Sequence, residues 1–319
     1  MPMVRHLQAI ILIISMRLAY PGHNHLGNCM LIETVHEALA DAEKNKSIAT
    51  RSHAVEFLRK VGLDDFGLIL IGMPNTQYPK LSRLLPSMAS EKVQNEWTGS
   101  SGATLLMQTN TFIRFLATSF ITLTKKDMVN AKVLDFGCGY GRSIRSLYCY
   151  VDPENISGVD PWNLSIEQCV LHGISGNIFQ SDYLPENLPF AAGQFDIIYA
   201  FSVFTHLSER ATRQSLNTLR KYISADGVLM ISVRPIEYWQ FDQNVPESLK
   251  PELEASHRSS GFAYCPHHRE PIDGDVTYGD TTIAVAWLQD NLPDWEVVLL
   301  DRPLIDPYQI YLALRPKNG

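Results

Sequence analysis

The stretch VLDFGCGYGR, Val133 to Arg142, sets how the rest of this chain is interpreted. Its first four residues are mostly apolar, as in strands that are buried on both faces of a parallel sheet. Asp135 lies within this run, and glycines follow at alternate positions, 137, 139 and 141. Residues 142–150 then place apolar side chains on one side of a helix. The pattern therefore predicts a buried strand, a glycine turn and a helix.

The acid and the glycine spacing indicate what the turn binds. Glycines between a strand and a helix permit positive φ angles and let a ligand approach the main chain. A dinucleotide turn has the spacing G-x-G-x-x-G and holds a pyrophosphate. This turn reads G-x-G-x-G, with Asp135 two residues ahead of the first glycine. It suits a ligand that presents a cation or hydrogen-bond donors, and it argues against the alternative of a nicotinamide-dependent oxidoreductase.

The same stretch resembles the first motif of the class I S-adenosylmethionine-dependent methyltransferases. The resemblance implies a doubly wound α/β fold, with a mostly parallel seven-stranded sheet whose last strand is antiparallel. It covers residues 130–234 by motif and 281–315 by pattern. It also implies that the turn holds the amino-acid end of S-adenosylmethionine, through Asp135, Gly137, Cys138, Gly139 and Gly141.

A second predicted strand follows in the sequence, and it also ends in an acidic residue. Residues 156–160 (ISGVD) end in Asp160, within the ~20-residue offset at which nucleotide-binding folds place a carboxylate for ribose hydroxyls. Pro161 and Trp162 then offer a flat apolar surface for an adenine ring. This segment resembles the second motif of the family, and Asn163 or Ser165 is expected to start the next helix.

The third and fourth predicted strands end in further candidates. The third ends in Asp182, which the resemblance places at the exocyclic amine of adenine, with Tyr183 beside the ring. The fourth ends in Phe201 and Ser202, in a segment that resembles the fourth motif of the family. Open α/β folds bind their ligands at this carboxyl edge of the sheet.

The remainder of the chain divides by pattern. Residues 1–30 begin with a charged, then apolar segment similar to a signal peptide but without a good cleavage site, and we interpret them as a leader or disordered extension. Residues 31–130 have helical periodicity and are predicted to form a helical cap, in which 66–71 is a short strand or a buried turn. Residues 131–319 are expected to form the S-adenosylmethionine-binding domain.

Residues 97–102 (WTGSSG) precede a helical block at 103–123. Ser101 or Thr104 is a candidate cap for that helix. Several methyltransferases resemble this arrangement, with an aromatic and glycine segment that closes over the methionine end of the cofactor. A capped helix with a packed tryptophan fits the local chemistry equally well.

The acceptor half of the site is less defined. His206 follows the fourth strand and is a candidate base, since histidine is the usual base near neutral pH, although a structural histidine is the alternative. Residues 235–280 form an insertion before a helix expected at 281–292, and we interpret it as a lid-like binding loop or an exposed polar loop. Its adjacent histidines lack the spacing of zinc helices, so no metal is predicted. The candidates for substrate binding are Arg234, Tyr264, His267 and His268.

The amino-acid composition limits the class of molecule expected as the methyl acceptor. The 319 residues include 27 Lys and Arg against 34 Asp and Glu, giving a net charge of −7 without a basic stripe, which argues against nucleic acid. The five cysteines are scattered and fit free thiols in the cytoplasm. The apolar run at the start is shorter than the ~20 residues of a membrane helix.

Together these features predict a cytoplasmic methyltransferase that uses S-adenosylmethionine. The expected acceptor is a small molecule or a glycan-like compound, methylated at oxygen. A non-catalytic, cofactor-binding subunit is the rival hypothesis, and the oligomeric state is left open.

Overall fold

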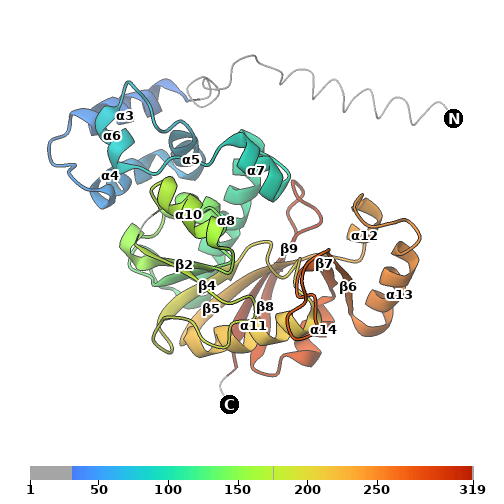
Figure 1. Ribbon diagram of the computed structural model, residues 1–319. Coiled ribbons are helices and arrows are strands. Elements are labelled where there is room, and N and C mark those ends of the chain that lie inside the picture. Colours follow the sequence, from blue (N-terminus) through green and yellow to red (C-terminus); the bar gives the residue numbers. More distant parts are fainter. Residues whose placement is uncertain (1–30, 175, 318–319) are drawn as a thin grey trace.

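The computed structural model describes residues 31–174 and 176–317 (Figure 1). The predicted leader, residues 1–30, lies outside the described part. A seven-stranded sheet forms the centre of the molecule, in the order β3-β2-β1-β4-β5-β9-β8. Strands β1 to β5 pair in parallel, and β9 is antiparallel to both of its neighbours. The predicted fold class is thus confirmed. The strands are β1 (Val133–Phe136), β2 (Ile156–Asp160), β3 (Asn177–Gln180), β4 (Phe195–Ala200), β5 (Ile223–Val233), β8 (Trp295–Asp301) and β9 (Ile310–Pro316).

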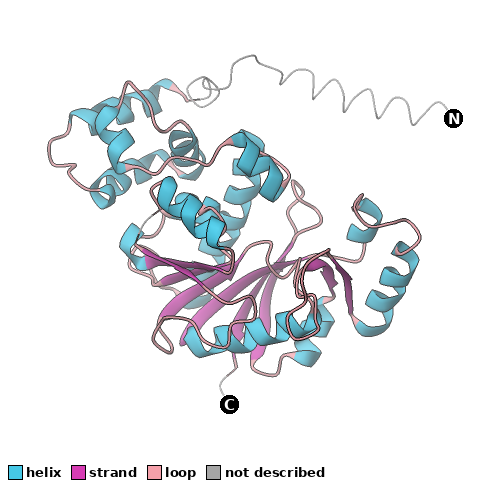
Figure 2. Ribbon diagram, in the orientation of Figure 1, coloured by secondary structure: helices cyan, strands magenta, loops and turns pink. Residues whose placement is uncertain are grey.

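Helices cover both faces of this sheet (Figure 2). Adjacent strand residues therefore enter different cores: Val133 packs with one apolar cluster and Leu134 with the other. On the first face lie α8 (Gly102–Thr124), α9 (Arg142–Leu147) and α10 (Asn163–Leu171). On the second lie α11 (Glu209–Tyr222) and α14 (Val285–Asn291). A short 3-10 helix, η2 (Pro153–Asn155), precedes β2.

The helices before α8 share the core of the first sheet face. Apolar residues such as Leu39, Leu58 and Leu70 belong to the same cluster as the strand residues Val133 and Ile197. The segment 66–71 is helical rather than a strand or a turn, because Asp64 and Asp65 occupy the first turn of a helix that is apolar on nearly every side. These elements are α3 (Glu33–Lys44), α4 (Arg51–Leu58), η1 (Arg59–Val61), α5 (Leu63–Ile71), α6 (Pro79–Leu84) and α7 (Glu91–Thr98).

The insertion after β5 is ordered rather than irregular. It contains α12 (Tyr238–Phe241), α13 (Lys250–Ser260) and an antiparallel hairpin of β6 (Phe262–Pro266) and β7 (Gly279–Ile283). The helix expected from residue 281 therefore begins four residues later, because its first three residues complete β7. No helix within residues 31–174 and 176–317 is long and apolar enough to cross a membrane.

Candidate active site

The glycine turn after β1 has the backbone that its sequence predicts. Gly137, Gly139 and Gly141 have φ angles of +81°, +52° and +75°. The amides of Gly137 and Cys138 donate to the Val159 carbonyl at 2.8 and 3.0 Å, which fastens the turn to β2. A Cβ built on Gly137 would approach Val203 Cγ2 to 2.4 Å, whereas one on Gly139 would meet no atom within 4 Å. A side chain would therefore clash with the protein at Gly137, whereas the space beside Gly139 is empty of protein atoms.

Asp160, at the end of β2, is held against this turn. Its Oδ2 accepts the Gly139 amide and its Oδ1 accepts the Trp162 amide, both at 2.9 Å. Burial raises the pKa of Asp160, and these two backbone hydrogen bonds lower it. Each carboxylate oxygen has further lone pairs, so this residue remains able to accept hydrogen bonds from a ligand.

Asp135 lies deeper, in the buried strand β1. Burial raises its pKa to about 7, the charge of Asp160 adds to this rise, and Tyr199 and Arg142 oppose it. The two carboxylates are therefore close enough to interact. Asp182 and Tyr183 lie just beyond the end of β3 and are exposed. The Ser181 amide donates to the Asp160 carbonyl at 3.1 Å, which keeps this segment beside the end of β2.

Aromatic rings flank the turn. Trp162 is 46% exposed, and its ring centroid lies 4.6 Å from that of Trp97 in α7. Trp97 also packs on Tyr140, at 5.7 Å. The expected cap is wrong: Ser101 makes no capping bond, and Gln94 Oε1 accepts the first amide of α8 at 3.0 Å. Trp97 is therefore a packed ring that leaves part of Trp162 accessible.

The end of β4 forms the next part of the carboxyl edge of the sheet. Phe201 stacks on Phe112 of α8 at 4.4 Å with 3° between the ring planes. The Arg142 guanidinium lies over the Phe201 ring, 4.8 Å from its centroid, which is a contact that the sequence did not indicate. Ser202 has a φ of +61°, which is rare outside glycine, and Ser232 Oγ accepts its amide at 2.8 Å. Such strained residues cluster at functional sites.

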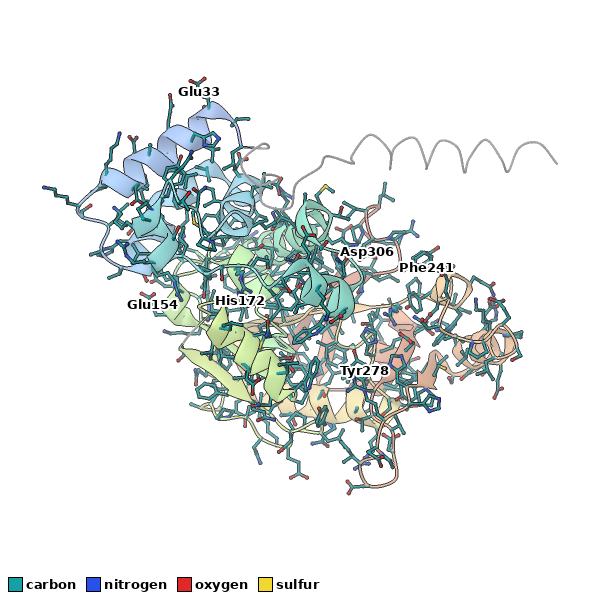
Figure 3. All side chains as sticks on the ribbon, turned by 45° about the horizontal axis from the view of Figure 1, so that its top comes forward. Glu33, Glu154, His172, Phe241, Tyr278 and Asp306 are labelled. Carbon is teal, nitrogen blue, oxygen red and sulfur yellow. The ribbon has the colours of Figure 1, made fainter. Side chains whose placement is uncertain are left out.

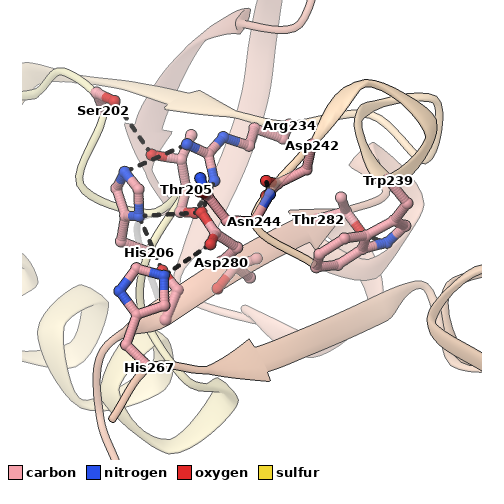
Figure 4. A network of polar contacts seen from close by, with 12 residues as sticks. Ser202, Thr205, His206, Arg234, Trp239, Asp242, Asn244, His267, Asp280 and Thr282 are labelled. Carbon is pink, nitrogen blue, oxygen red and sulfur yellow. Dashed lines mark hydrogen bonds and ion pairs between the residues drawn. The ribbon is translucent and has the colours of Figure 1, made fainter. Parts of the chain in front are cut away.

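A polar network continues from Ser202 (Figure 4). His206 Nδ1 donates to the Gly279 carbonyl at 2.8 Å, and its Nε2 accepts from Arg234 Nη2 at 3.3 Å. Arg234 Nη1 also bonds Asp280 Oδ1 at 2.6 Å, and His267 Nε2 bonds Asp280 Oδ2 at 2.7 Å. The Tyr278 ring stacks on His206 at 5.0 Å. Four of these five residues come from the insertion or its border with β5.

The comparison with known families decides the identity of this region. Residues 133–227 match the model of a methyltransferase domain. This stretch runs from the first residue of β1 into β5 and includes the turn, Asp160 and Ser202. Residues 133–227 therefore match a methyltransferase domain.

Several solved structures are similar to the chain. A S-adenosylmethionine-dependent methyltransferase from Clostridium acetobutylicum is 10% identical, covers 71% of this chain and 97% of its own, and has a TM-score of 0.46. The glycopeptide N-methyltransferase MtfA, complexed with sinefungin, is 12% identical over 63% and 93%, with a TM-score of 0.44. A S-adenosylmethionine-dependent methyltransferase from Mesorhizobium loti is 13% identical over 62% and 96%, with a TM-score of 0.42. No curated protein gives a significant match.

The residues of the matched segment suit the S-adenosylmethionine that the sequence predicts. Space is open beyond Gly139, a half-exposed indole stands at Trp162, and the Asp160 carboxylate accepts the amides of both residues. A sulfonium with an ammonium group matches such acidic surroundings. The side chain of Cys138 is buried and lies against β2, because a Cβ built on Gly158 would approach the Cys138 Cβ to 3.0 Å.

The polar network limits the chemical roles of two residues that the sequence analysis predicts for the acceptor site, His206 and Arg234. Burial and the charge of Arg234 place the pKa of His206 well below its usual range. Because its Nε2 lone pair also accepts from Arg234, the geometry disfavours a role for His206 as a base, and that role stays a prediction. Arg234 is 7% exposed and paired with Asp280, so its charge is already compensated.

The remaining substrate candidates lie on the hairpin. The Tyr264 hydroxyl donates to the Val276 carbonyl, and His267 and His268 are exposed at the end of β6. The sequence did not single out Asp280, because its importance depends on partners 46 and 13 positions away. Among the described residues, no three His, Cys, Asp or Glu side chains converge as a metal site.

Proposed function

We propose that this enzyme transfers a methyl group from S-adenosylmethionine to a hydroxyl oxygen of a small-molecule or glycan-like acceptor. The observation that carries the proposal is the His206–Arg234–Asp280–His267 network beside the end of β4. It places two histidines and a carboxylate at the edge where open α/β folds bind ligands. The net charge of −7 supports an acceptor that is not a polyanion.

For the cofactor half, we propose that each predicted residue contacts one part of the ligand. The turn and Asp135 would hold the amino-acid end, supported by the open space at Gly139. Asp160 would accept the ribose hydroxyls. The adenine would lie among Pro161, Trp162, Asp182 and Tyr183, with Phe201 and Ser202 beside the methyl-bearing end. The bound cofactor supplies an activated methyl group on a good leaving group, and the protein holds the acceptor in line with it.

For the acceptor half, we propose a pocket bordered by Arg234, Tyr264, His267 and His268. The hairpin β6–β7 is fixed to the loop after β4, because the Gly279 amide donates to the His206 carbonyl at 2.8 Å and the Thr281 amide to the Thr205 carbonyl at 2.9 Å. A rigid support of this kind positions an acceptor well. We also propose that residues 31–130 act as a cap on the cofactor site, supported by the contact of Trp97 with Trp162.

We further propose that the enzyme works in the cytoplasm, where S-adenosylmethionine is made. The described cysteines Cys138, Cys149, Cys169 and Cys265 are free thiols, which is consistent with a reducing compartment.

Calorimetry tests the cofactor half. We expect S-adenosylmethionine and S-adenosylhomocysteine to bind the wild type and to bind Asp160→Ala much more weakly, because two amides and the proposed ribose contacts lose their acceptor. Asp290→Ala, on the exposed side of α14, is the matched control and should bind like the wild type. Equal, negligible binding by wild type and Asp160→Ala would overturn the proposal.

Labelling tests the acceptor half. A cell extract incubated with enzyme and S-adenosyl-[methyl-3H]methionine should gain label in a small-molecule or glycan fraction, and mass spectrometry of the product should locate the methyl on oxygen. Label confined to nucleic acid, or to nitrogen, would contradict the proposed acceptor.

A further inference from the structure

His267 and Asp280 form a pair outside the segment that matches the methyltransferase family. His267 directly follows β6, Asp280 lies in β7, and the His267 amide donates to the Tyr278 carbonyl at 3.1 Å. The two side chains meet at 2.7 Å, through His267 Nε2 and Asp280 Oδ2. The carboxylate side chain is 7% exposed and the imidazole 41%. One partner is thus buried and the other reaches solvent.

The buried partner is ionised. Burial raises the pKa of Asp280, but Arg234 and the hydrogen bond from His267 outweigh it, so the pKa lies below its usual value. Arg234 Nη1 occupies Oδ1, which leaves Oδ2 to accept the Nε2–H of His267. This bond fixes the tautomer of neutral His267, because a proton on Nε2 leaves the lone pair on Nδ1.

The free nitrogen distinguishes His267 from His206. Among the described residues, Nδ1 of His267 has no hydrogen-bond partner, whereas both ring nitrogens of His206 are occupied. The charged and titratable groups that face His267 are Asp280 on its own hairpin, His206 from the loop after β4, Arg234 from the end of β5, and Arg269 and Tyr278 from the hairpin tip.

The pair faces the cofactor edge of the sheet. The Tyr278 ring packs against both histidines, with its centroid 5.0 Å from that of His206 and 5.6 Å from that of His267, and the two histidine centroids are 6.4 Å apart. Burial raises the pKa of Tyr278, and the charge of Asp160 contributes to this rise. The hairpin lies against the loop after β4, because Tyr278 forms a β-bridge with Leu207 and the Gly279 amide donates to the His206 carbonyl at 2.8 Å (Tyr278 is labelled in Figure 3).

We propose that His267 is the general base of the reaction and that Asp280 is the residue that positions it. The inference rests on the proposed transfer to a hydroxyl group. The acceptor oxygen forms a bond to the methyl carbon as the carbon–sulfur bond breaks, and the electron pair of that bond stays on the sulfur. The hydroxyl proton passes to Nδ1 of His267, and Asp280 stabilises the resulting imidazolium before the proton leaves to solvent.

The first test needs no turnover. In the 15N-labelled, cofactor-free protein at pH 8, long-range 1H–15N spectra should show His267 with a proton on Nε2 and a bare Nδ1, assigned by the signals lost in His267→Gln. Asp280→Asn should abolish this preference. A proton on Nδ1 of the wild type at this pH would overturn the proposal.

The second test follows label transfer in the extract with S-adenosyl-[methyl-3H]methionine. His267→Gln should lower the rate by about 100-fold or more, which is the usual contribution of a general base. The control Asp290→Ala, on the exposed side of α14, should change the rate by less than about twofold. Calorimetry should give the same cofactor affinity for all three proteins.

The outcomes separate the two proposals. If His267→Gln retains the wild-type rate while cofactor binding and labelling persist, His267 is not the base and the enzyme remains a methyltransferase. If the wild type neither binds the cofactor nor transfers label, the proposed function itself fails. Thermal unfolding of each variant identifies any loss that comes from misfolding.

Discussion

Gly139 and Asp160, which are 21 positions apart, are joined by a hydrogen bond of 2.9 Å from the glycine amide to the carboxylate. The bond links the turn after β1 to the end of β2, and it leaves space above the glycine. One contact therefore shapes the turn and also holds in place Asp160, the acid that we propose binds the ribose. The predictions below begin from this relationship.

Substituting Gly139 should harm binding more than stability. Gly139→Ala places a Cβ in the open space at a φ of +52°, where an L-residue is strained by about 1–2 kcal/mol. Cofactor affinity should fall about tenfold or more, equivalent to about 1.4 kcal/mol, measured by calorimetry. Gly193→Ala is the control, because Gly193 has a φ of +65°, equally open surroundings and a position at the opposite edge of the sheet. Equal affinity in both variants would refute this role for Gly139.

Asp135 should make stability depend on pH. Its pKa is raised from 3.8 to about 7, so the folded state holds the proton more tightly than the unfolded chain does. This contribution stabilises the protein below about pH 4 and is lost as the pH rises to about 7. In Asp135→Asn, the cofactor-free protein should therefore gain up to about 4 kcal/mol at pH 8 and little at pH 4, measured by urea unfolding.

The same variant should bind the cofactor less well, because the carboxylate that would face the ammonium is gone. For the wild type, affinity should increase from pH 6 to pH 7.5 as Asp135 loses its proton. A flat profile in the wild type, or one unchanged by the substitution, would exclude an interaction of this carboxylate with the ligand.

Phe112 should couple the helical region to the site. It is fully buried and stacks on Phe201, so Phe112→Ala should cost about 3–5 kcal/mol of unfolding free energy through the cavity that it leaves. Because Phe201 loses its support, cofactor affinity should fall as well. Phe57→Ala, at a half-buried position in α4, is the comparison and should leave the affinity unchanged. A fall in affinity for Phe57→Ala would show a general loss of structure instead.

Arg234 and Asp280 should show strong coupling. Either side chain alone would be a buried, uncompensated charge, so Asp280→Asn or Arg234→Met should each destabilise the protein by about 3–5 kcal/mol. The double variant should lose less than the sum, and a double-mutant cycle by urea unfolding measures this difference. Additive losses would mean that the ion pair does not stabilise the fold.

Parts of the fold and the backbone of the glycine turn could be predicted because their signals are local. Buried parallel strands appear as apolar runs, and the glycine turn follows from φ angles that other residues rarely adopt. Helix boundaries near the insertion were less accurate. Thr281 has helical neighbours in sequence, but it completes the hairpin by pairing with Tyr264. Strand pairing of this kind depends on a partner that the local pattern does not contain.

The sequence by itself determined that a strand, an acidic glycine turn and a second acid meet at one edge of a parallel sheet, because chain connectivity places these strand ends together. The tertiary structure alone decided which polar groups are free to react. Arg234 is neutralised and His206 is occupied, while His267 keeps an available nitrogen, because the hairpin packs against the loop after β4. These pairings join residues 13 to 73 positions apart, and only side-chain packing brings them into contact.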